Sequence, residues 1–83
     1  MRVQGTEIDD AALATVRAWI ARQTVGFTFG DVADKLRRAK VPYAISDRAT
    51  NRLLQQMKRA GVVAFRDGYW HTIPAPEIKE TAA

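Results

Sequence analysis

The chain has 83 residues, with 13 Lys and Arg against 9 Asp and Glu, one His, no Cys and a formal net charge of +4. This length favours one small domain, and the lack of Cys excludes disulfides and thiolate metal sites. The apolar runs are too short to span a membrane and the start lacks the apolar region of a secretory signal, so we expect an intracellular, soluble protein.

A first helix is expected from about 9 to 23, after a loose end at residues 1–5. Apolar residues recur there at helical spacing and define a buried side: Leu13, Val16 and Ile20. Trp19 is expected to close the core from its edge, where the indole N–H stays in contact with water. Residues 24–30 then break the helical period with two Gly, and predict a very short strand.

A second helix is expected from about 31 to 40, with Thr28 or Gly30 supplying its start. Pro42 ends it, because the residue before a proline avoids the helical region. Tyr43 and Ile45 are expected to hold the following turn against the core.

The third helix is expected at 46–61. Ser46 or Asp47 can cap its start, because a short side-chain oxygen accepts from a free N–H of the first turn. Gly61 stands where helices commonly end in a left-handed residue. The residues at helical spacing between these signals form the expected buried side: Thr50, Leu53, Leu54 and Met57.

After this helix the period changes from 3.6 to 2. Residues 62–66 and 69–73 are β-rich and flank Asp67-Gly68, a strong signal for a two-residue hairpin turn. The residues expected to point inward are Val63, Phe65 and Trp70, with Thr72 or Ile73. Two prolines follow, and residues 77–83 are expected to form a loose tail.

This order of elements resembles the winged helix-turn-helix family over about residues 8–74. Three segments carry the resemblance: F-T-F-G-D-V-A-D-K-L, T-N-R-L-L-Q-Q-M-K-R-A-G-V-V and V-A-F-R-D-G-Y-W-H-T-I. They are similar to the family's short strand with its second helix, its recognition helix and its wing. The resemblance implies a single small α+β domain of three helices, with a C-terminal β-hairpin wing and a very short strand after the first helix.

The family resemblance also implies that the third helix enters a DNA major groove. The residues then expected to face bases are Arg48, Ala49, Asn51, Arg52 and Gln55. Lys58 and Arg59 would meet phosphates instead, and Arg66 at the tip of the wing would approach the minor groove. The wing is short and carries an acid beside its single arginine, which departs from the family pattern.

The charge distribution agrees with a polyanionic partner. Between residues 35 and 59 Asp47 is the only acid, against eight basic residues: Lys35, Arg37, Arg38, Lys40, Arg48, Arg52, Lys58 and Arg59. Such polarity attracts a polyanion to one side of a protein, although solvated helix surfaces also carry basic residues. Arg37, Arg38 and Lys40 are thus either phosphate anchors or complements of a helix dipole.

The sequence offers little support for catalysis. His71 is the only histidine and Ser46 the only serine, and no cluster has the spacing of metal ligands. No glycine-rich motif of a nucleotide site is present. We therefore expect no enzyme activity, no cofactor, no metal and no small-molecule substrate.

Two functions are compatible with these features. The first is double-stranded DNA binding by a small transcriptional regulator or an accessory protein of a DNA transaction, whose small size is compatible with a phage origin. Tight binding would then need a homodimer or a protein partner. The second is a protein-interaction module without DNA binding, since the fold alone does not set the function. Its expected surface comprises Trp19, Tyr43, Tyr69 and Trp70. Charge alone also leaves RNA open as a partner.

Overall fold

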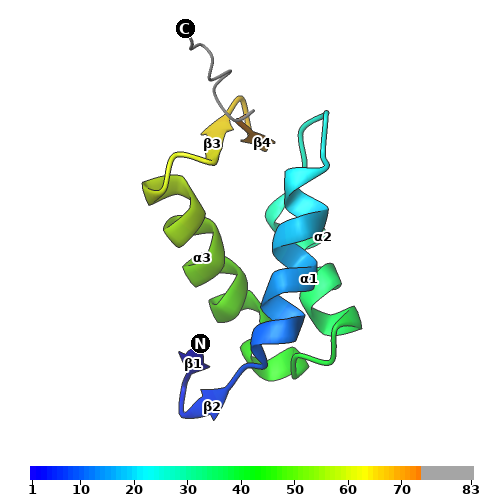
Figure 1. Cartoon of the computed structure of the whole chain (residues 1–83), viewed down its shortest axis with the longest axis vertical. Helices are drawn as coiled ribbons and strands as arrows, with labels where there is room; N and C mark the ends of the chain where they lie inside the picture. Colours follow the sequence, from blue (N-terminus) through cyan, green and yellow to red (C-terminus); the bar gives the residue numbers. More distant parts are fainter. Residues whose placement is uncertain (74–83) are drawn as a thin grey trace, which may run out of the picture.

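The computed structural model describes residues 1–73. A first hairpin, three helices and a second hairpin follow one another along the chain: β1 (Arg2–Val3), β2 (Thr6–Glu7), α1 (Asp10–Ala21), α2 (Phe29–Arg38), α3 (Tyr43–Arg59), β3 (Val63–Arg66) and β4 (Tyr69–Thr72). The two hairpins lie at opposite ends of the molecule (Figure 1). The three helices with a hairpin directly after α3 confirm the expected α+β fold with winged-helix topology. The loose tail expected at 77–83 lies outside the described residues.

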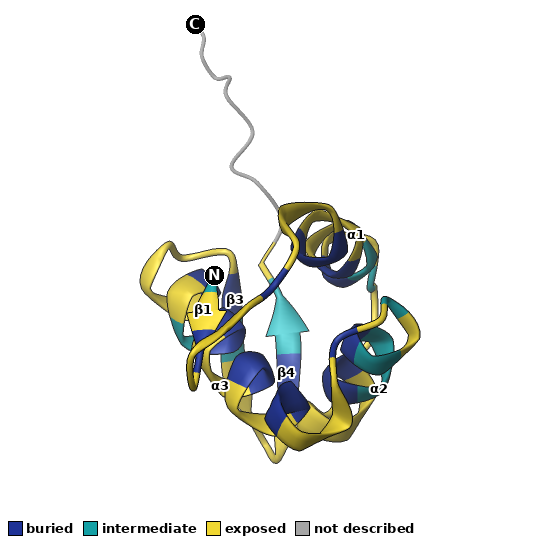
Figure 2. Ribbon diagram, turned by 90° about the horizontal axis from the view of Figure 1, so that it is seen from below, coloured by how far each residue is buried: buried dark blue, intermediate teal, exposed yellow. Residues whose placement is uncertain are grey.

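The core forms where the buried sides of the three helices face one another (Figure 2). Each large apolar side chain buried there contributes about 1.5–3 kcal/mol. The stripes expected on the first and third helices are confirmed, because their apolar residues are all buried. Trp19 is half-buried at the edge of this core, with its ring 5.7 Å from that of Phe27, as expected.

Side-chain caps set the starts of α1 and α2. Asp9 accepts a hydrogen bond from the N–H of Ala11 at 3.1 Å. Thr28 and Asp31 form a reciprocal capping box, in which each side chain accepts from the other residue's N–H at 3.1 and 3.0 Å. Helix α2 therefore begins two residues earlier than expected, directly after the Thr28 cap.

The start of α3 differs from the expectation. The helix begins at Tyr43, with Pro42 in the cap position, so neither Ser46 nor Asp47 is the cap. Ser46 is fully buried in the first turn, where its Oγ donates to the carbonyl oxygen of Tyr43 at 2.9 Å. Ile45 is buried and holds the turn against the core as expected, whereas Tyr43 is 76% exposed and does not.

Helices α2 and α3 end in the same way. Each is followed by a residue in the left-handed region, Lys40 with φ 77° and Gly61 with φ 78°. In both cases the next N–H, from Val41 or Val62, donates back into the last helical turn at 3.0 Å. The expected stop at Gly61 is thus confirmed.

The N-terminal residues form an ordered hairpin, which corrects the expectation of a loose end at residues 1–5. Strands β1 and β2 pair in antiparallel fashion around Gln4 and Gly5, whose φ angles are 49° and 78°. Val3 is buried in the core at 2% exposure. The hairpin packs against α3, to which a hydrogen bond from Arg52 to the carbonyl oxygen of Arg2 connects it.

The C-terminal hairpin has the turn that the sequence predicts. Asp67 and Gly68 have φ angles of 55° and 83°, as a two-residue hairpin turn requires. Val63 and Trp70 are buried as expected. Phe65 is 52% exposed, contrary to expectation, because it lies near the tip of the hairpin, where its ring centre is 5.2 Å from that of Trp70.

The very short strand expected after the first helix is a single bridging residue. Phe27 exchanges two backbone hydrogen bonds with Trp70, at 2.9 and 2.8 Å. The neighbouring Gly26 allows this approach, since a Cβ there would lie 2.9 Å from the Cβ of Tyr69. This bridge attaches the C-terminal hairpin to the segment between α1 and α2.

Candidate nucleic-acid interface

One face of α3 is polar and open to solvent along most of its length. Arg48, Asn51, Gln55 and Arg59 follow one another at spacings of three and four residues, and we call them the α3 stripe. Gln55 is half-buried and the other three are exposed. At 1.5 Å of rise per residue the stripe is about 16 Å long.

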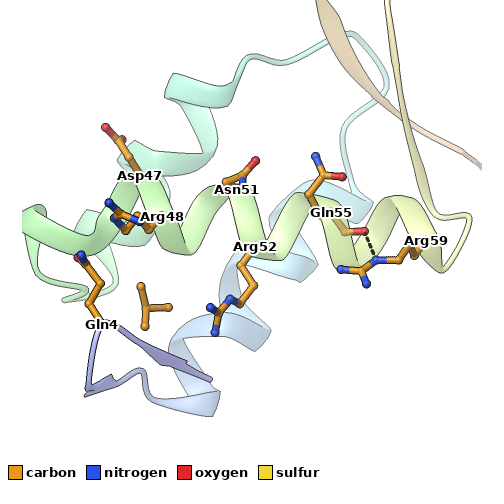
Figure 3. Close-up of a pocket in the computed structure, with 8 residues that line it drawn as sticks. Gln4, Asp47, Arg48, Asn51, Arg52, Gln55 and Arg59 are labelled. Carbon is orange, nitrogen blue, oxygen red and sulfur yellow. Dashed lines mark hydrogen bonds between the residues drawn. The ribbon is translucent and has the colours of Figure 1, made fainter.

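The α3 stripe lines a groove of about 570 Å³, which we call the α3 groove (Figure 3). The N-terminal hairpin borders the groove through Val3 and Gln4, while Asp47 and Arg52 complete its lining from α3. The groove thus contains three arginines against one aspartate, so its net charge is positive.

Arg52 lies toward the flank of α3 that the hairpin contacts. Its Nη1 donates to the carbonyl oxygen of Arg2 at 2.5 Å. Figure 3 shows its side chain turned toward the hairpin, whereas Asn51 and Gln55 point the other way. Arg52 therefore connects α3 to the hairpin, a role that the sequence did not indicate.

The guanidinium of Arg37 contacts three residues in the first turns of α3. Its Nε donates to Oγ of Ser46 at 2.9 Å and one Nη donates to Asp47 at 3.2 Å. Its guanidinium also lies 4.2 Å from the ring centre of Tyr43. Since 31% of the side chain is exposed, Arg37 chiefly connects α2 to α3, and the charge of Asp47 is paired within the protein.

Arg38, Lys58 and Arg66 are exposed, whereas Lys35 is half-buried. Arg38 forms an ion pair with Asp34, one turn earlier in α2, at 2.8 Å; such a surface pair contributes less than about 1 kcal/mol. Lys58 lies next to Arg59 at the end of α3, and the Nε of Arg59 donates weakly to the Gln55 carbonyl oxygen at 3.4 Å. Arg66 is exposed at the end of β3.

Ala49 does not belong to this surface, which corrects its assignment as a base-facing residue. It is fully buried, on the same side of α3 as Leu53 and Met57. These residues lie four apart, so the helical spacing itself indicates this side.

The aromatic residues considered as a protein-binding surface do not gather in one place. Trp70 is buried, and Trp19 is half-buried with the ammonium of Lys35 5.3 Å from its ring centre. Tyr43 and Tyr69 are exposed, but they lie at the start of α3 and in the C-terminal hairpin beyond its other end.

Gln4 of the N-terminal hairpin lines the groove but was not predicted as a site residue from the sequence. Its only local signal there is the glycine that follows it.

Among residues 1–73, no group of three or more His, Cys, Asp or Glu could hold a metal ion. Within the same residues, no helix combines the length and the apolar character needed to cross a membrane.

Comparisons with protein-family models, with curated proteins and with solved structures found no match to this chain. The candidate interface therefore rests on its own geometry and charge.

Proposed function

We propose that this domain binds double-stranded DNA through α3, as a small transcriptional regulator or an accessory protein of a DNA transaction. The observation that carries the proposal is the α3 stripe, a solvent-facing row of Arg, Asn, Gln and Arg, beside which the one acid of the groove, Asp47, is paired with Arg37. Arg bonds guanine in two-pronged fashion, and Asn and Gln bond adenine in the same way.

The dimensions of α3 suit the major groove. An α-helix with its side chains is about 10–12 Å across, and the major groove of B-DNA is about 12 Å wide. The 17 residues of α3 extend from Tyr43 to Arg59, so the helix is long enough to place the whole stripe in the groove.

Contacts to phosphates would come from Arg59 at the end of the stripe and from the exposed cations around it. Lys58 and Arg59 end α3, Arg66 ends β3, and Arg38 lies near the end of α2. Such contacts fix the register of a protein on the duplex without distinguishing its sequence. Arg37 would not bind a phosphate itself. It would position the start of α3, because two of its donors already bond residues there.

One such module contacts only a small part of a duplex, roughly 600–1,000 Å². Tight and specific binding would therefore use a second copy of the domain or a protein partner on the DNA. Bacteriophages are one setting in which such a domain would act.

The test is DNA binding by two variants that lose the same charge. Arg48→Ala removes a stripe residue, and Arg22→Ala removes an exposed arginine just after α1, outside the α3 groove. With a mixed-sequence duplex at low salt, Arg48→Ala should weaken binding at least about fivefold, and Arg22→Ala less than about twofold. Fluorescence anisotropy measures both affinities, and equal losses in the two variants would remove α3 from the interface.

A second candidate function is protein interaction through the C-terminal hairpin. Four large apolar side chains on or next to this hairpin are exposed: Val62, Phe65, Tyr69 and Ile73. The register pairs Phe65 with Trp70 and Tyr69 with Arg66, so Phe65 and Tyr69 lie on opposite faces of the hairpin. Exposed apolar residues on one element are typical of interaction surfaces. Sedimentation of the protein and of Phe65→Ser would test it, since self-association that the variant abolishes favours this function.

A further inference from the structure

The N-terminal hairpin is not one of the elements that the winged-helix resemblance covers, yet it borders the α3 groove. Val3 anchors it in the core and Gln4 lines the groove. The hydrogen bond from Arg52 to the carbonyl oxygen of Arg2 fixes it to the flank of α3. Figure 3 shows Gln4 beside Arg48, so the hairpin turn and the start of the α3 stripe face the same space.

We propose that this hairpin is a second DNA-binding element, in which Gln4 and the adjoining turn bond a phosphate of the strand beside α3, while Arg52 positions the hairpin. The inference rests on the proposed DNA binding by α3. It adds to that function a contact to one backbone strand and a role for a segment outside the three helices.

The position of the hairpin indicates which part of the DNA it contacts. A helix of about 10–12 Å fills a major groove of about 12 Å, so an element on the flank of the helix meets the sugar–phosphate backbone. The base edges are left to the α3 stripe. Gln4 thus faces a phosphate, not a base.

The chemistry of the turn suits a phosphate. A glutamine amide and free backbone N–H groups are common donors to phosphate oxygens. At Gly5 nothing lies within 4 Å of the place that a Cβ would occupy, so a phosphate can approach the backbone closely. The positive charge of Arg48 lies on the same groove and favours an anion there.

Charge substitutions at two neighbouring hairpin positions test the contact. Gln4→Glu places a negative charge in the groove, and Thr6→Glu places the same charge on β2, outside the groove lining. We expect Gln4→Glu to weaken binding to a mixed-sequence duplex about fivefold or more, and Thr6→Glu less than about twofold. Gln4→Lys should strengthen binding, whereas Thr6→Lys should change it little.

An amide NMR titration separates the role of Arg52 from folding. In the unaltered protein, residues 2–7 and the α3 stripe should both shift when the duplex is added. In Arg52→Ala the α3 shifts should persist while those of residues 2–7 fall by more than half, because the hairpin loses the hydrogen bond that orients it beside α3 and keeps only its Val3 anchor.

The outcomes distinguish the two proposals. If α3 shifts but the Gln4 and Thr6 variants bind equally, the hairpin contact is overturned and DNA binding by α3 stands. If residues 2–7 shift as strongly in Arg52→Ala as in the unaltered protein, the positioning role of Arg52 is overturned. If no residue shifts at low salt, the DNA-binding function and the hairpin contact both fail.

Discussion

The two hairpins have the same turn geometry, but they are anchored to the rest of the molecule in different ways. In both, a non-glycine residue and a glycine adopt positive φ, at 49° and 78° for Gln4 and Gly5, and at 55° and 83° for Asp67 and Gly68. In both, the two strands pair in antiparallel fashion. Turn geometry alone therefore does not distinguish them.

The difference lies in how each hairpin is anchored. The C-terminal hairpin has strands of four residues, two buried side chains, Val63 and Trp70, and a backbone bridge to Phe27. The strands of the N-terminal hairpin are two residues long, and Val3 is its one buried residue. An isolated two-stranded hairpin is at best marginally stable in water, so this hairpin depends on its contacts with the helices.

Replacing the main anchor of the C-terminal hairpin should give the largest effect. Trp70→Ala removes a buried ring that packs in the core, and should lower the free energy of unfolding by about 3–5 kcal/mol. Urea denaturation measures this loss. The control is Tyr69→Ala in the same strand, half exposed, which should cost less than about 1 kcal/mol. Similar losses in both variants would show that the buried ring is not the anchor.

Replacing the anchor of the N-terminal hairpin should give a smaller and more local effect. Val3→Ala removes two methyl groups from the core and should cost about 1–2 kcal/mol. The amides of residues 2–7 should then exchange with solvent faster, while those of β3 and β4 stay as protected as before. Equal acceleration in both hairpins would contradict the idea that they are anchored independently. The exposed Thr6→Ala is the control.

The smallest effect concerns the first residue of each turn. Gln4→Asn should raise the free energy of unfolding by about 0.5 kcal/mol, because asparagine tolerates positive φ better than glutamine does. This corresponds to a rise of about 2–4 °C in Tm. Asp67→Asn is the matched control and should change Tm less, since aspartate already tolerates this conformation. A fall in Tm for Gln4→Asn would show that the glutamine side chain stabilises the hairpin.

The same contrast explains which parts of the fold the sequence could predict. Asp67-Gly68, Gly61 and Thr28 act through local geometry and hydrogen bonds to nearby backbone, so their effects are visible in a short stretch of sequence. The N-terminal hairpin depends on contacts with residues far along the chain, such as that of Arg2 with Arg52. No local pattern indicates such a contact.

The predicted start of α3 was wrong for a related reason. Ser46 has the chemistry of a cap, but its hydroxyl is used inside the helix and by Arg37 of α2. Pro42 takes the cap position without a side-chain hydrogen bond, so no polar cap residue marks this boundary in the sequence. The side chains expected to cap the helix are instead bonded to Arg37 of α2, a contact that the local sequence does not show.

The candidate site was predicted in part. The spacing of Arg48, Asn51 and Gln55 placed these side chains on one exposed face, as the structure has them. Ala49 was assigned wrongly although the same spacing aligns it with buried residues. The contact between Arg52 and the hairpin forms only in the tertiary structure. The sequence therefore could not predict that the Arg52 side chain lies against the hairpin.

The contacts of Arg37 also affect how α2 and α3 open. One side chain of α2 bonds Ser46 and Asp47 and lies over Tyr43, so α2 cannot separate from the start of α3 without losing all three interactions. The two helices should therefore open as one cooperative unit in native-state hydrogen exchange, at a higher free energy than either hairpin. The surface that we propose for DNA would then be carried on the part of the molecule that opens last.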